Sequence, residues 1–228
     1  MSRSAIFGIL ISTSILFFIL RRKLFYKLIL YLFALLLLFL LIQPLAEITV
    51  FFFRVEEGLS AREQTWSLSL NIIRDHFLFG IGPGAYKYEM FNYFPYMLND
   101  WWGRLFIYYH EVTNGANFSH NFFLTFFTDM GILGLITAVT LPVLYFKISL
   151  STLRKYKNES TEIYYLIVAL FAAGVSIIAR NFFNSIGLLF YGGITTDLPF
   201  WIIFGGLIYF YQATLPVRNV IDEPVIDS

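Results

Sequence analysis

Long apolar blocks constrain this chain most, because a run of about 20 apolar residues is what an α-helix needs to cross the hydrocarbon core of a membrane. Hydrophobic residues make up 58% of the 228 residues and charged residues only 14%, whereas a soluble domain carries about 25% charged residues. The sequence therefore predicts an all-α, polytopic membrane protein. We expect five transmembrane helices, at residues 5–20, 28–50, 121–146, 163–179 and 198–211.

The orientation follows from the positive charges, which are enriched on the cytoplasmic side of membrane proteins. Such charges follow the first and third blocks: Arg21, Arg22, Lys23, Lys27, Lys147, Arg154, Lys155 and Lys157. A signal peptide would instead carry its charges before the apolar stretch. We therefore expect a retained first span and a single multi-pass domain in the cytoplasmic membrane. It comprises two spans (1–53), a large, partly helical extracytoplasmic loop (54–119), three spans (120–212) and a cytoplasmic tail (213–228).

Charge and composition exclude several function classes. The formal net charge is +1, so the whole-chain charge indicates no nucleic-acid partner. The chain has no cysteine, and its three histidines match no zinc-binding spacing. We therefore expect no metal and no disulfide.

The outer loop contains a predicted amphipathic helix. Ser60 and Glu63 have the spacing of a capping box at a helix start. Arg62 stands one turn before an apolar stripe, and is either a snorkelling charge or a functional cation. The stripe predicts a helix lying on the membrane surface or on the bundle. Its members are Trp66, Leu70, Ile73 and Phe77.

A glycine-rich turn follows this helix, with the sequence Gly80-Ile81-Gly82-Pro83-Gly84. Three glycines and a proline predict a tight backbone path. Such a turn can present N–H groups to phosphate. No strand precedes it, however, so the simpler interpretation is a turn that ends the surface helix.

A histidine stands at the start of the third apolar block. We predict Ser119 as the N-cap, so that the helix begins at His120 with its positive dipole end and unpaired N–H groups facing outward, where they favour an anion. The imidazole is either a general base or an ordinary interfacial polar residue. Asp129 lies about 13 Å deeper and half a turn out of phase. We predict a structural role for that carboxylate.

These residues give the chain a resemblance to the O-antigen ligase and O-antigen polymerase family of bacterial membrane glycosyltransferases. Three features carry it. The first is Arg62 and Trp66 ahead of the glycine-rich turn. The second is Ser119-His120-Asn121 followed, after nine residues, by Gly131-Ile132-Leu133-Gly134. The third is the large outward loop that joins the second span to the third. The resemblance covers residues 55 to 145 and indicates the C-terminal half of the family's fold.

The resemblance implies an inverting transfer of a glycan from an undecaprenyl-diphosphate carrier to an acceptor hydroxyl, without metal ion or other cofactor. The process would be surface polysaccharide biosynthesis, of O-antigen (lipopolysaccharide), capsule or exopolysaccharide. His120 and Arg62 match the family's catalytic positions. The partners implied are the lipid-linked oligosaccharide, a glycan or lipid acceptor, and membrane lipids. The residues expected to bind substrate are Arg180, Asn121, Trp66, Gly82 and Gly84.

The chain also departs from the family pattern. Members are longer, so we expect a separate N-terminal half or a chain-length regulator as a further partner. Members often carry a further essential arginine on an earlier loop; Arg180 is the expected substitute, ahead of Arg74 and Arg104. Leu135 and Ile136 stand where some ligases have threonines, which favours a polymerase. The alternative function is a non-catalytic membrane subunit of a glycan-assembly complex.

Overall fold

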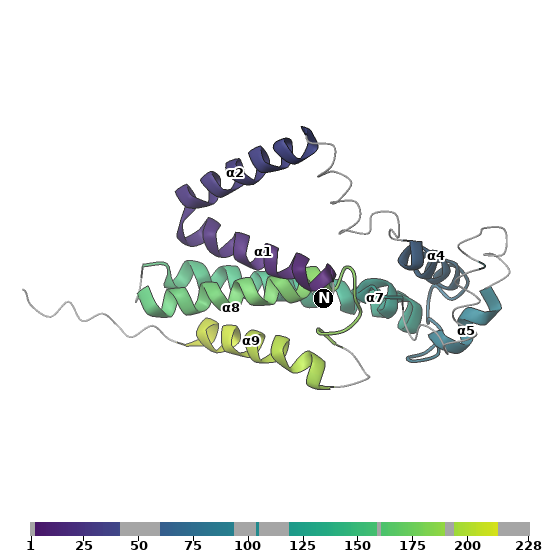
Figure 1. The fold of residues 1–228 in the computed structure, drawn as a ribbon. Helices are drawn as coiled ribbons and strands as arrows, with labels where there is room; N and C mark the ends of the chain where they lie inside the picture. The colour runs from purple at the N-terminus through teal and green to yellow at the C-terminus, as the bar shows by residue number, and fades with distance from the viewer. Residues whose placement is uncertain are drawn as a thin grey trace, which may run out of the picture.

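The computed structural model describes residues 3–41, 60–93, 104, 119–158, 161–189 and 194–213. Within these ranges all regular structure is helical, which confirms the predicted class. Figure 1 shows the helices: α1 (Arg3–Leu20), α2 (Arg22–Leu41), α4 (Ser60–Asp75), α5 (Tyr86–Tyr93), α7 (Phe122–Tyr156), α8 (Thr161–Arg180) and α9 (Ile194–Gln212).

Helices α1, α7, α8 and α9 form a bundle whose core is apolar and aromatic (Figure 1). Tyr145 of α7 is fully buried at its centre. The Tyr145 hydroxyl donates to the carbonyl oxygens of Phe171 at 2.9 Å and Leu170 at 3.0 Å in α8. The ring lies where a Cβ on Gly174 would stand, so that glycine lets α7 and α8 approach closely. A buried hydroxyl with a partner avoids the cost of an unsatisfied polar group.

Three helices are long and apolar enough to cross a membrane within the described ranges: α7, α8 and α9. Helix α1 is a shorter apolar helix over Ser4–Leu20. Helix α2 begins at Arg22, earlier than the predicted start at residue 28, and residues 42–50 of that predicted span lie outside the described residues. The five-span count therefore stays a prediction.

The predicted end of the third span at residue 146 is wrong. Helix α7 continues to Tyr156, so Lys147 and Arg154 are helical rather than in a loop. Both side chains are exposed, which lets a charged residue extend an apolar helix without being buried. Helix α9 likewise begins at Ile194, four residues before the predicted start.

Helices α4 and α5 lie together at the N-terminal end of α7 (Figure 1). The helix start expected near Ser60 is confirmed, but the predicted apolar stripe is only partly buried. Leu70 is 57% exposed and Phe77 49% exposed. The buried side of α4 combines Ile73 of the stripe with four residues outside it: Thr65, Leu68, Ser69 and Ile72.

Hydrogen bonds between α4 and Tyr86 of α5 explain why a partly polar face of α4 is buried. The Tyr86 hydroxyl of α5 donates to the Thr65 carbonyl at 3.1 Å, and Ser69 Oγ donates to that tyrosine oxygen at 3.2 Å. Burial raises the pKa of Tyr86, with Ser69 opposing the shift and the nearby Asp129 adding to it. A hydroxyl with a hydrogen-bond partner is buried at little cost. A prediction from the spacing of apolar residues does not include such polar residues in the buried face.

The glycine-rich turn binds a break in α7. Gly131 has φ 60° and ψ −145°, a conformation that only glycine adopts readily. At the break, Ile81 N donates to Thr128 O and Gly82 N to Asp129 O, both at 2.8 Å, while Ile132 N donates to Phe77 O at 3.0 Å. We call these three hydrogen bonds the backbone clamp. A Cβ on Gly80 would stand 2.6 Å from Gly131 N, so the two chains touch through bare backbone.

Replacing Gly131 by alanine should therefore undock α4. The new Cβ would overlap the Leu78 carbonyl and would force alanine into a strained positive φ, which alone costs about 1–3 kcal/mol. We expect a clear fall in the melting temperature of the detergent-purified chain.

Gly205→Ala is the matched control, because a Cβ at Gly205 in α9 meets nothing within 4 Å. We expect that variant to melt at or slightly above the wild-type temperature. Equal melting temperatures for Gly131→Ala and the wild type would contradict the clamp.

Candidate functional site at the mouth of α7

His120 occupies a special backbone position at the N-terminal end of α7. Its φ is 52°, and it is the non-glycine residue with positive φ in the described part of the chain. Such strained positions cluster at functional sites. The predicted N-cap at Ser119 is wrong: Asn121 is the N-cap, its side chain accepting from Leu124 N at 3.1 Å, and the helix begins at Phe122. His120 therefore lies just outside the helix and is half-buried.

The mouth of α7 is tied to the segment that follows α8. Phe122 N donates to Asn181 O at 3.0 Å, and the Asn121 side-chain amide donates to Phe182 O at 3.0 Å. With Leu124 N bonded to the cap, two of the first helical N–H groups already have protein partners. The expectation of unpaired N–H groups at this mouth is therefore wrong for Phe122 and Leu124. The positive end of the helix dipole remains.

A chain of hydroxyls fixes the residue before the histidine. Ser119 is fully buried. Its Oγ lies 2.8 Å from Thr125 Oγ1, which lies 2.8 Å from Ser185 Oγ. Thr65 Oγ1 of α4 donates to the Arg62 carbonyl at 2.8 Å and also lies 3.5 Å from the Ser119 carbonyl oxygen. Three separate elements thus hold the backbone at His120, and the Thr65 contact continues what the backbone clamp begins.

Arg62 of α4 is the charged group that acts on His120. Both side chains are half-buried. Partial burial and the nearby Arg62 guanidinium together lower the pKa of His120 below 6.5. Desolvation and a neighbouring cation both disfavour an imidazolium. His120 is therefore neutral at pH 7 and able to accept a proton, and the structure brings together the two residues predicted to be catalytic.

Phe183 is a site residue that the sequence interpretation missed. The Arg62 Cζ lies 5.9 Å from the centroid of the Phe183 ring, and the Trp66 ring stacks on that ring at 6.3 Å and 28°. Phe183 also meets Phe7 of α1 edge-on at 5.7 Å. An arginine over an aromatic face gains cation–π attraction. The clue in the sequence was the polar and aromatic run from Arg180 to Asn184 at the end of an apolar block.

Arg180 lies at the same end of the bundle, in the last turn of α8. Its Nη2 donates to Ile186 O at 2.7 Å, while its Nε is buried with no hydrogen-bond partner in the described part of the chain. The bond to Ile186 ties this guanidinium to the backbone of the segment after α8, and its substrate role stays a prediction. The alternatives Arg74 and Arg104 are exposed.

The remaining predicted binding residues have roles in the fold. Gly82 uses its N–H in the backbone clamp, and Gly84 has φ 79° with open space where a Cβ would stand. Asn121 uses both ends of its amide. Trp66 Nε1 is buried without a hydrogen-bond partner among the described residues. Within the same ranges, no three His, Cys, Asp or Glu side chains come together as a metal-binding group.

The fold and the site define a helical membrane protein that carries a histidine–arginine pair at one end of its bundle. The family model described as O-Antigen ligase matches residues 1–139, more than half of the chain. The chain belongs to this family, and the match begins well before the residue 55 expected from motifs. No curated protein and no solved structure matches it.

The electrostatic coupling at this site can be measured by titrating His120. We expect its pKa to lie below 6.5 in the wild type and to rise in Arg62→Gln, because a repelling cation is removed while burial remains. Histidine NMR signals recorded against pH in detergent micelles would give both values.

Arg74→Gln is the matched control, since Arg74 is an exposed cation in the last turn of the same helix. It should leave the His120 titration unchanged. An unaltered pKa in Arg62→Gln would show that the two side chains are not coupled.

Proposed function

We propose that this protein transfers a glycan from an undecaprenyl-diphosphate carrier to an acceptor hydroxyl in surface polysaccharide biosynthesis. Membership of the O-antigen ligase family supports a ligase-like glycosyltransferase activity. The observation that carries the proposal is the half-buried His120, whose pKa is lowered by burial and by the Arg62 cation beside it. A base and a cation side by side suit a reaction in which one group loses a proton and another gains negative charge.

In the proposed step the acceptor oxygen attacks the anomeric carbon and forms the new glycosidic bond. The bond from that carbon to the diphosphate oxygen breaks, and its electron pair leaves with the lipid diphosphate. His120 accepts the hydroxyl proton, for which a neutral imidazole is required. Attack opposite the leaving group inverts the anomeric carbon, and the step needs no metal ion.

Arg62 stabilises the departing diphosphate in this proposal. A guanidinium can give two parallel hydrogen bonds to phosphate oxygens. Its charge has a second effect, since the same cation lowers the His120 pKa. The Trp66 and Phe183 rings beside it provide apolar faces of the kind that pack on sugar rings. Arg180, at the same end of the bundle, is the proposed second contact for the carrier.

We also propose the topology that this reaction requires. Five spans with positive loops inside would place His120 on the extracytoplasmic face of the bacterial inner membrane. Leu135 and Ile136 favour a polymerase over a ligase. A separate N-terminal half or a chain-length regulator is a further proposed partner.

The proposal is tested with a lipid-linked repeat unit and the chain in nanodiscs. We expect His120→Ala to slow transfer by about 10²–10⁴-fold, the usual contribution of a general base. Arg62→Ala should also abolish most of the transfer, with both variants present in the membrane at wild-type levels.

Two control variants match the residue types. His76 is half-buried beside Glu89, 3.9 Å away, and Arg74 is exposed; His76→Ala and Arg74→Ala should keep wild-type rates. Transfer that survives both His120→Ala and Arg62→Ala would contradict the mechanism. A wild-type chain that transfers nothing but co-purifies with a glycan-assembly protein would favour a non-catalytic subunit.

A further inference from the structure

A basic pocket lies at the end of the bundle opposite His120. Its volume is about 370 Å³, and seven residues line it: Ile19, Arg22, Leu150, Leu153, Arg154, Lys157 and Tyr164. They come from the α1–α2 junction, the C-terminal end of α7 and the first turns of α8. Helix α7 separates this pocket from the mouth at His120 by about 50 Å of helix, so it is a different site.

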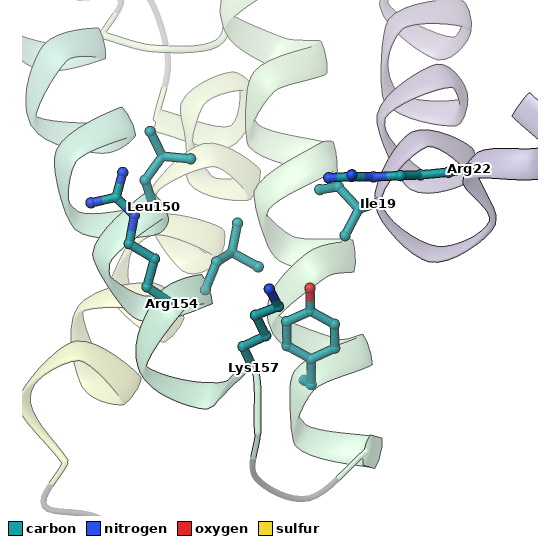
Figure 2. Close-up of a pocket in the computed structure, with 7 residues that line it drawn as sticks. Ile19, Arg22, Leu150, Arg154 and Lys157 are labelled. Atoms are coloured by element: carbon teal, nitrogen blue, oxygen red, sulfur yellow. The ribbon is translucent and has the colours of Figure 1, made fainter. Parts of the chain in front are cut away.

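Three cations surround the pocket and no carboxylate lines it. Figure 2 shows Arg22 reaching in from the α1–α2 junction, with Lys157 and Arg154 on the α7 side. Glu162, in the first turn of α8, is exposed and is not a lining residue. Within the described part of the chain, none of the three cations forms an ion pair with a carboxylate. Among the described residues, no carboxylate pairs with the positive charge of this pocket.

Neighbouring Lys155 differs from the three pocket cations because its charge is used to stabilise the fold. Its Nζ donates to the carbonyl oxygens of Tyr211 at 3.0 Å and Phe210 at 3.4 Å, and also to that of Ala213. It thereby satisfies the C-terminal end of α9. Arg22, Arg154 and Lys157 have no such carbonyl partners among the described residues. Arg22 Cζ instead lies over the Phe18 ring, 5.1 Å from its centroid, which holds its guanidinium in place.

The apolar part of the lining distinguishes a lipid from a soluble anion. Ile19, Leu150 and Leu153 belong to α1 and α7, which continue from the pocket into the bundle as apolar helices. A phosphate held by the cations would leave attached acyl chains free to run along these helices. Basic pockets between transmembrane helices bind lipid phosphates in this way. Inorganic phosphate would gain nothing from the apolar wall.

We propose that this pocket binds the phosphate headgroup of an anionic membrane phospholipid. Arg22 and Lys157 bind the phosphate from two sides, and Arg154 adds a third positive charge. Since Arg22 belongs to α2 and Lys157 directly follows α7, the bound lipid links two elements that otherwise meet mainly through α1 and α8. The proposal does not depend on the glycan chemistry at His120.

Native mass spectrometry of the detergent-purified full chain tests this, with phosphatidylglycerol as the probe. The wild type should retain phosphatidylglycerol in preference to phosphatidylcholine. Arg22→Gln combined with Lys157→Gln should weaken phosphatidylglycerol binding roughly 30-fold, at about 1 kcal/mol for each cation near the phosphate. Both side chains are exposed, so the fold should survive, and an unchanged melting temperature checks this.

Lys23→Gln combined with Lys27→Gln is the matched control. It removes the same amount of charge from the first turns of α2, at exposed residues that do not line the pocket, and should leave binding within about twofold. Equal losses in the two double variants, or no loss in either, would overturn the site. Inorganic phosphate that displaces the lipid completely at equal concentration would overturn the lipid assignment and point to a soluble anion.

Discussion

The backbone clamp between the glycine-rich turn and the break in α7 is the interaction on which the site depends. Three hydrogen bonds of 2.8–3.0 Å join the residues after α4 to residues 128–132. They require bare backbone on both sides, because a Cβ on Gly80 or Gly131 would overlap the opposing chain. The break also frees carbonyls inside an apolar helix, and the turn satisfies them, as buried backbone groups must be. The clamp thereby holds the chain that leaves α4 against the break in α7.

The electrostatics of the site follow from that docking. Helix α4 carries Arg62, and its Thr65 Oγ1 lies 3.5 Å from the carbonyl oxygen of Ser119, the residue before His120. Phe183, from the segment after α8, packs against Arg62 and Trp66 from the other side. A strained backbone at His120 and a cation beside a half-buried imidazole are costly to the fold. Such costs are typical of functional sites. This agrees with the membership of the chain in the O-antigen ligase family.

The sequence was sufficient for the fold class and for helices at most of the predicted positions, since the periodicity of apolar residues is a local property. The predicted N-cap of α7 was wrong because two nearby residues are both suited to that position. Ser119 and Asn121 are both good N-caps, and the choice depends on Thr125, which engages the serine hydroxyl. The predicted buried face of α4 was also wrong, because the Thr65 and Ser69 hydroxyls are satisfied by backbone carbonyls of the same helix and Ser69 also by the Tyr86 hydroxyl. Phe183 was missed since its partners lie more than a hundred residues away along the chain.

One measurement tests the docking of α4 and its electrostatic consequence together. The chain has no cysteine, and the Phe77 and Phe127 rings meet beside the clamp with centroids 5.4 Å apart. A chain carrying Phe77→Cys and Phe127→Cys should be joined rapidly by a short thiol-specific cross-linker, and the cross-linked protein should keep a His120 pKa below 6.5. Failure to cross-link, or a cross-linked chain whose His120 titrates at the ordinary value, would contradict the account.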